Sequence, residues 1–195
     1  MTLIAFLRHG RTAWNAEGRF QGRTDIPLSD EGRKALAGLR LPVELAGAIC
    51  HVSPLVRARE TASLLGLGDA VEPRLIEMSF GRYEGRTRDE LRADPDEGMA
   101  ANEAQGLDFQ PPGGETPREV QARLQPWLAE LAQAGGRHVA VTHKAVIRAA
   151  LALAYDWPML GRSPQKLDWS RLHLFRAEPG GRLLPERMNV PLESA

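Results

Sequence analysis

The 195-residue sequence contains only one cysteine, Cys50. An intramolecular disulfide needs two cysteines, so the fold cannot depend on one. Cys50 lies in an apolar run at residues 48–52, where a buried and unreactive thiol is the expected state. A cysteine-dependent catalytic or redox function is therefore not expected.

The sequence also lacks an excess of charge of either sign. Twenty-five basic and 25 acidic residues give a formal net charge of zero at pH 7. This balance provides no broad positive field to attract nucleic acid, so we expect no nucleic-acid partner. An anionic ligand would have to be bound by a local group of cations.

Long hydrophobic runs are absent as well. No stretch approaches the roughly 20 apolar residues of a membrane-spanning helix, and the first ten residues do not resemble a secretory signal peptide. We therefore expect a cytoplasmic protein without a membrane partner. Hydrophobic residues make up 43% of the chain, enough for one substantial core, so residues 1–195 are predicted to form a single domain. Nothing in the charge or the length predicts an oligomeric state.

Short apolar runs alternate along the chain with segments of helical periodicity. The runs predicted to be strands are residues 3–6, 48–52, 71–76 and 138–142. The segments predicted to be helices are about 30–41, 55–65, 117–134 and 143–155. This alternation predicts a three-layer α/β/α fold around a mostly parallel central sheet.

Two further regions complete the predicted fold. Residues 172–177 and 183–188 are expected to be edge strands. The segment at about 86–112 is charged, bounded by proline and poorly periodic, so we expect it to be a small insertion that caps the active site. The clearest helix start is Thr116-Pro117-Arg118-Glu119, which combines a capping box with proline at the first helical position.

The first predicted strand ends in a basic pair, Arg8 and His9. Open α/β sheets bind their ligands at the carboxyl ends of the strands. A guanidinium group matches the oxygens of a phosphate, and an imidazole is a nucleophile or proton carrier near neutral pH. Arg57, Glu77 and His143 occupy the same kind of position, at a strand end or a helix start. Together these residues predict a site for an anion.

The motifs that contain these residues resemble the histidine phosphatase superfamily, also called the phosphoglycerate mutase-like family. The matching segments follow the order of that family: LRHGRT at 7–12, WNAEGRFQGRTDIPLSDEG at 14–32, SPLVRARETA at 53–62, EMSFGRYEG at 77–85, PPGGETPREV at 111–120 and VTHKAVIR at 141–148. The resemblance implies an enzyme that acts on a small phosphorylated substrate and needs neither a metal ion nor another cofactor.

The resemblance also implies the catalytic roles. His9 would attack phosphorus and form a phosphohistidine, which water then hydrolyses. Glu77 would protonate the leaving alkoxide and afterwards activate the water. Arg8, Arg57 and His143 would bind the phosphate oxygens, with His143 held in its protonated form as a donor.

Six further positions are expected to bind the substrate, and two of them depart from the family pattern. The six are Arg11, Thr12, Asn15, Gln21, Gly22 and Lys144. The family commonly has Glu or Gln in place of Arg11 and glycine in place of Lys144. If both side chains face the cleft, they would recruit a second anionic group of the substrate. The alternative is that they point to solvent.

The short chain and the pattern at residues 77–85 favour the small phosphatases of this family, which are broad-specificity or α-ribazole phosphatase-like enzymes. A phosphoglycerate mutase is the alternative, but we expect the segment at 86–112 to be too short and too weakly apolar to exclude water. A non-catalytic phospholigand-binding module is the third hypothesis. No metal site is predicted, because no carboxylate or cysteine stands at ligand spacing from the histidines.

Overall fold

The computed structural model describes residues 2–194, which contain one central sheet of five strands in the order β3-β4-β1-β5-β6. These strands are β1 (Thr2–Arg8), β3 (Ile49–Val52), β4 (Gly136–Thr142), β5 (Leu172–Ala177) and β6 (Leu183–Val190). β1 lies in the middle, parallel to β4 and antiparallel to β5. Four of the five strands run in the same direction, and β5 runs against them.

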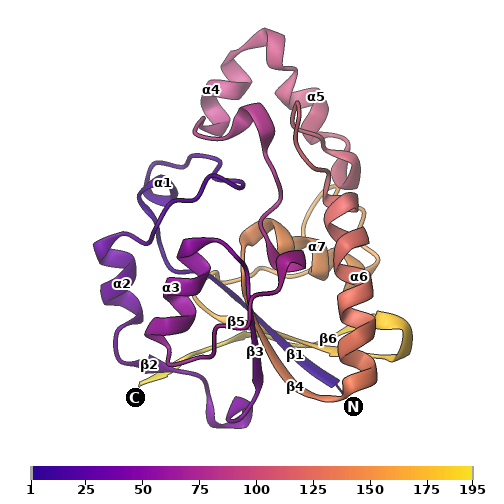
Figure 1. The fold of residues 1–195 in the computed structure, drawn as a ribbon. Helices are drawn as coiled ribbons and strands as arrows, with labels where there is room; N and C mark the ends of the chain where they lie inside the picture. Colours follow the sequence, from indigo (N-terminus) through magenta and orange to yellow (C-terminus); the bar gives the residue numbers. More distant parts are fainter. Residues whose placement is uncertain (1, 195) are drawn as a thin grey trace.

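Helices cover both faces of the sheet, because successive residues of β1 point to opposite sides. Ile4 and Phe6 pack beneath α6 (Pro117–Ala134) and α7 (Lys144–Tyr155). Ala5 and Leu7 pack on the other side, against α2 (Asp30–Leu36) and α3 (Val56–Leu64). Figure 1 shows α6 on one side of the strands and α2 and α3 on the other. The predicted three-layer α/β fold is confirmed.

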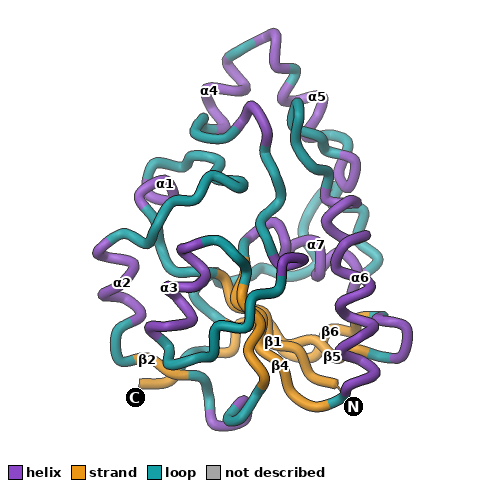
Figure 2. Tube along the Cα trace, in the orientation of Figure 1, coloured by secondary structure: helices purple, strands orange, loops and turns teal. Residues whose placement is uncertain are grey.

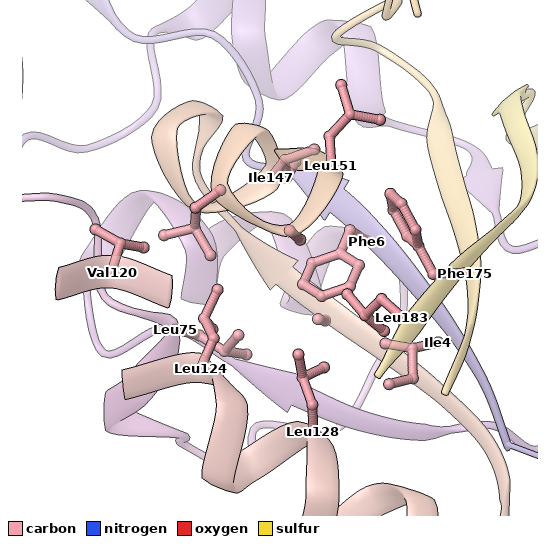
Figure 3. Packing of buried hydrophobic residues seen from close by; sticks show 14 of the residues in the cluster. Ile4, Phe6, Leu75, Val120, Leu124, Leu128, Ile147, Leu151, Phe175 and Leu183 are labelled. Carbon is pink, nitrogen blue, oxygen red and sulfur yellow. The ribbon is translucent and has the colours of Figure 1, made fainter. Parts of the chain in front are cut away.

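Phe6 is the centre of the larger core. Its ring meets Trp127 and Phe175 edge to face, with ring centroids 6.1 and 5.6 Å apart. Such pairs contribute about 0.5–1.5 kcal/mol beyond the burial of their area. Figure 3 shows Phe6 between the aliphatic side chains of the two covering helices, among them Leu128 and Ile147. This packing fixes β1, and hence the basic pair at its end.

The two C-terminal strands differ in position. β6 lies at the edge of the sheet, as predicted, whereas β5 lies between β1 and β6. The residues of β5 are buried on both faces of the sheet. A short apolar run is typical of an inner strand as much as of an edge strand, so the sequence did not separate the two.

The predicted helix at 30–41 ends early, at Leu36. Gly38 has φ +71°, a backbone conformation that an α-helix cannot contain. The next two residues form β2 (Leu39–Arg40), which pairs with β7 (Glu193–Ser194). The partner strand is far away in the sequence, so helical periodicity alone did not reveal this pairing.

The predicted strand at 71–76 was wrong. Only Val71 makes a bridge, to Val52, and the chain then forms a 3-10 helix, η2 (Pro73–Leu75). Proline has no N–H to donate to a strand ladder, which explains the change. The consequence for the site is that Glu77 follows a 3-10 turn rather than a strand.

The segment predicted as a cap stands above the carboxyl end of β1. It contains α4 (Arg88–Ala93) and α5 (Met99–Glu103), which Figure 1 shows at the top of the molecule. Tyr83, Leu91 and Met99 form a small buried cluster there. The segment therefore has more apolar packing than its sequence indicated. A single domain over residues 1–195 with a cap at about 86–112 stays a prediction.

Loops and short helices connect these elements. Figure 2 shows that loops occupy most of the space between the strands and the cap helices. The remaining elements are α1 (Ala13–Ala16), η1 (Val43–Leu45), η3 (Gly81–Tyr83), η4 (Pro95–Glu97), η5 (Gly106–Asp108) and η6 (Pro179–Gly181). Among the helices of residues 2–194, none combines the length and the hydropathy needed to cross a bilayer.

His173 lies inside β5 and is fully buried. Its Nδ1 accepts a hydrogen bond from the backbone N–H of Asn189, at 3.4 Å, and the edge of its ring faces Trp169. Burial lowers the pKa of His173 to about 4. At a pH between these two pKa values, about 4 when folded and the ordinary 6.5 when unfolded, the unfolded chain binds a proton at His173 and the folded protein does not.

We predict that His173 makes the protein sensitive to acid. Its contribution to stability is complete above the unfolded pKa of about 6.5 and is lost as the pH falls towards 4. Between about pH 7 and about pH 4.5, the free energy of unfolding should fall by roughly 2 kcal/mol more in the wild type than in His173→Asn, which keeps the acceptor but does not titrate. Urea unfolding at both pH values measures this difference, and equal losses would contradict the prediction.

Candidate active site

A cleft of about 700 Å³ opens between the carboxyl end of β1 and the cap. Its walls come from the end of β1, the loop around α1, the start of α3, the segment after η2, parts of the cap, the start of α6, the start of α7 and the loop after α7. Eight of the eleven site residues predicted from the sequence line it: Arg8, His9, Arg11, Asn15, Gln21, Arg57, Glu77 and Lys144.

His9 follows β1 directly and stays attached to the sheet, because its backbone N–H donates to the carbonyl of Thr142 at 2.9 Å. The Nδ1 atom of its ring lies 2.7 Å from the carbonyl oxygen of Gly10. A carbonyl can only accept, so Nδ1 carries the hydrogen and the neutral ring has its lone pair on Nε2. Burial, together with the nearby charges of Arg8 and Arg57, lowers the pKa of His9 well below its ordinary value. Nε2 is therefore available as a nucleophile at neutral pH.

His143 lies against His9, with the two ring centroids 5.1 Å apart. The protonated state of His143 stays a prediction, and the surroundings of the free site oppose it. Burial, and then the neighbouring His9 and Arg57, lower its pKa well below the ordinary value. Its Nε2 lies 2.6 Å from Oγ of Ser53. A neutral ring that accepts the Ser53 hydroxyl at Nε2 keeps its hydrogen on Nδ1, so it remains a donor without a positive charge.

Arg57 is completely buried, and backbone carbonyls hold its guanidinium group. Nη1 donates to Thr24 at 2.9 Å and Nη2 donates to Gly22 at 2.7 Å. Within residues 2–194, neither Arg57 nor Arg8 forms an ion pair with a carboxylate. Their positive charges are therefore left to bind an anion at the floor of the cleft.

Glu77 is buried beside these cations, and 6% of it is exposed. Its two carboxyl oxygens accept from the backbone N–H groups of Met78, at 2.9 Å, and Ala145, at 3.4 Å. Burial nevertheless raises the pKa of Glu77 above its ordinary value. The carboxyl group is thus more readily protonated than an exposed one, as a general acid requires.

The other predicted binding positions divide into neutral and charged ones. Thr12 is buried as the N-cap of α1, in a capping box with Asn15. Gln21 lines the cleft, and its Oε1 has no partner among residues 2–194. Arg11 and Lys144 also line the cleft and are exposed at its opening, so they face the cleft rather than pointing away from it.

Sequence reasoning missed Glu84, which holds the loop that orients Arg57. One of its carboxyl oxygens accepts from the backbone N–H of Arg23 at 3.0 Å, and the other accepts from that of Thr24 at 2.9 Å. The fit is close at Gly22, where an added Cβ would lie 1.9 Å from Oε1 of Glu84 and where φ is +55°. The motif EMSFGRYEG contains Glu84, but only the fold shows that its partner is a backbone loop.

Ser53 was missed for a similar reason. It belongs to the motif SPLVRARETA, yet its hydroxyl meets His143, which is 90 residues away in the sequence. The backbone N–H of Leu55 donates to the same oxygen at 3.4 Å. Since Ser53 is fully buried, its hydroxyl serves His143 rather than the solvent.

We predict that Glu84→Gln weakens the binding of inorganic phosphate about tenfold, because an amide NH₂ group would face backbone donors and loosen the carbonyls that hold Arg57. Isothermal titration calorimetry with inorganic phosphate measures the effect. Glu90→Gln is the matched control, since it makes the same change in an exposed capping box of α4. An unchanged phosphate affinity in a folded Glu84→Gln protein would count against this role.

Comparisons with known proteins identify the family of the chain. The family model described as histidine phosphatase superfamily (branch 1) matches residues 4–186. A probable phosphoglycerate mutase GpmB of Enterobacter sp. (strain 638) is 34% identical over 152 residues, covering 73% of this chain and 70% of the relative. A glucosyl-3-phosphoglycerate phosphatase of Mycobacterium tuberculosis (strain ATCC 25618 / H37Rv) is 34% identical over 191 residues, covering 87% and 84%.

Solved structures share the same fold. A mycobacterial glucosyl-3-phosphoglycerate phosphatase in complex with VO3 superimposes with a TM-score of 0.77 at 30% identity, covering 96% of this chain and 98% of that one. Bacillus stearothermophilus YhfR superimposes with a TM-score of 0.81 at 27% identity, covering 97% and 98%.

Proposed function

The chain belongs to the histidine phosphatase superfamily (branch 1), and from this premise we propose that it hydrolyses small phosphomonoesters through a phosphohistidine intermediate on His9. One observation carries the proposal. The neutral ring of His9 keeps a free lone pair on Nε2, and it does so next to Arg8 and Arg57, two cations without an ion-pair partner in residues 2–194. This arrangement combines a nucleophile with binding groups for the negative centre that it attacks.

In the first step, the phosphoryl group of the substrate binds to Arg8 and Arg57. Nε2 of His9 attacks phosphorus, an N–P bond forms, and the P–O bond to the leaving group breaks. The two guanidinium groups stabilise the charge on the non-bridging oxygens. Glu77, whose pKa burial raises, gives its proton to the departing oxygen.

In the second step, Glu77 is a carboxylate and accepts a proton from water. The oxygen of that water attacks phosphorus, the N–P bond breaks, and inorganic phosphate leaves. His9 regains its neutral form, because its surroundings oppose a positive charge on the ring. Glu77 is protonated again, so the site is ready for another substrate.

Water access favours a phosphatase over a mutase. Arg11 and Lys144 line the cleft and are exposed, and charged side chains of this kind keep water near them rather than exclude it. A mutase has to keep water away from its phosphohistidine. The alternative still has support in the relatives named as phosphoglycerate mutases. ³¹P NMR of 3-phosphoglycerate separates the two, since a phosphatase releases phosphate and a mutase produces the 2-isomer.

We predict that His9→Ala lowers phosphomonoester turnover by at least about 10³-fold, because the neighbouring imidazole, that of His143, has its Nε2 engaged with the Ser53 hydroxyl and cannot replace the nucleophile. The assay measures phosphate release from a panel of phosphomonoesters, with and without a chelator. His51→Ala is the control, as it removes a histidine outside the cleft.

Chelator-resistant turnover that depends on His9 would support the mechanism. Turnover that the chelator abolishes would contradict it. A wild-type protein that binds inorganic phosphate but turns over no ester would favour the non-catalytic binding module instead.

We predict that Glu77→Gln affects poor leaving groups most. Nitrophenolate departs without a proton, whereas an alkoxide needs one, so the loss of kcat/KM should be about 10²-fold larger for an alkyl phosphate than for nitrophenyl phosphate. Steady-state kinetics with both esters measure the ratio. Equal losses for the two esters would argue against Glu77 as the acid.

A further inference from the structure

Positive charge dominates the cleft beyond what one phosphoryl group requires. Its two acidic lining residues are Glu77 and Glu103, and the cationic ones are Arg8, Arg11, Arg19, Arg57, Arg88, Lys144 and Arg148. Arg19 is paired with Glu17, and Arg88 is paired with Glu103 at 3.0 Å. Once Arg8 and Arg57 hold the reacting group, three cations of the cleft still have no ion-pair partner among residues 2–194.

Two of these three cations belong to the same face of α7. Lys144 and Arg148 are four residues apart, so their side chains lie one helical turn from each other. Each contacts an aromatic ring: Nζ of Lys144 lies 5.3 Å from the ring centroid of Trp169, and Cζ of Arg148 lies 5.2 Å from that of Trp157. These contacts orient the two side chains but do not neutralise their charges.

The surroundings of the pair are also positive. Partial burial lowers the pKa of Lys144, and the charges of Arg8, Arg148 and Arg88 lower it further, against a smaller opposite effect of Glu77. Burial and Arg88 likewise lower the pKa of Arg148. Arg88 comes from α4 in the cap, so cations approach this place from two sides of the cleft. Like charges that converge in a partly buried place repel one another unless an anion binds between them.

We propose that Lys144 and Arg148, the two unpaired cations of α7, bind a second anionic group of the substrate. This inference rests on the proposed function, in which Arg8 and Arg57 bind the phosphoryl group that reacts. The second group is a carboxylate or a second phosphoryl group, because both are anions with oxygen acceptors that suit ammonium and guanidinium donors. The enzyme then prefers phosphomonoesters that carry a second negative charge over neutral sugar or alcohol phosphates.

Matched ligands test the proposal by binding. 3-Phosphoglycerate and glycerol 3-phosphate share a carbon skeleton, but the first carries a carboxylate where the second has a hydroxymethyl group. Fructose 1,6-bisphosphate and fructose 6-phosphate differ in a second phosphoryl group. Isothermal titration calorimetry with the His9→Ala protein measures all four affinities without turnover. We expect the doubly anionic member of at least one pair to bind about fivefold more tightly, and the pair that shows it identifies the second group.

Variants of Lys144 then test whether this side chain causes the preference for the doubly anionic ligand. In the His9→Ala background, Lys144→Gln should reduce the affinity ratio of that pair to near one, and Lys144→Arg should retain most of it. Lys34→Gln is the matched control, because it removes the same charge from an exposed position of α2 outside the cleft. Equal affinities within both pairs, or a Lys144→Gln change that weakens both members equally, would overturn the proposal.

The outcome is independent of the test of His9. A preference that depends on Lys144, in a protein without His9-dependent turnover, would overturn the proposed function and leave the second anion site intact. Turnover that depends on His9, without any preference between the ligands, would overturn the second anion site and leave the proposed function intact.

Discussion

The burial of Arg57 without a carboxylate partner is the constraint on which the site depends. A buried guanidinium group loses its water, and here two backbone carbonyls from the loop at residues 22–24 replace part of that hydration. The carbonyls satisfy donors but leave the charge in place, so the group still attracts an anion. Burial is the main cause of the lowered pKa of His9 and of His143, and the charge of Arg57 adds to it in both cases. Anion binding and nucleophile activation therefore share one cause.

This constraint explains why the surrounding loops are so well anchored. Glu84 accepts hydrogen bonds from the loop that holds Arg57, and Arg123 of α6 donates to the carbonyl of Ile76 at 2.7 Å, next to Glu77. The loop that holds Arg57 and the segment that carries Glu77 are thus each fixed by a side chain from another part of the fold. A loop that moved by about an ångström would separate the charge from the reacting group, and positioning errors of that size cost catalysis heavily.

The sequence predicted those parts of the structure that depend on local rules. The capping box at Thr116 starts α6, and the chemistry-bearing residues of the motifs meet in one cleft. It failed at Leu39, whose strand partner lies at the far end of the chain. It also failed at residues 71–76, where the apolar pattern outweighed the local effect of Pro73. The protonation of His143 stays a prediction, since it depends on burial and on neighbours that no spacing reveals. The roles of the site residues in catalysis remain predictions.

The cations of the cleft form two groups: an inner group proposed to act on phosphorus and an outer group proposed to recognise the rest of the substrate. The groups proposed to act on phosphorus come from the ends of β1 and the start of α3, which the cores on both faces of the sheet hold rigidly. Lys144, Arg148 and Arg88 lie further out, on α7 and the cap, where side chains are partly exposed. Exchanging an outer residue changes which leaving group fits and leaves the inner charges in place. A fold built in this way can keep one reaction while its substrates change, which is why the outer cations, rather than the histidine pair, are the residues from which the substrate class has to be inferred.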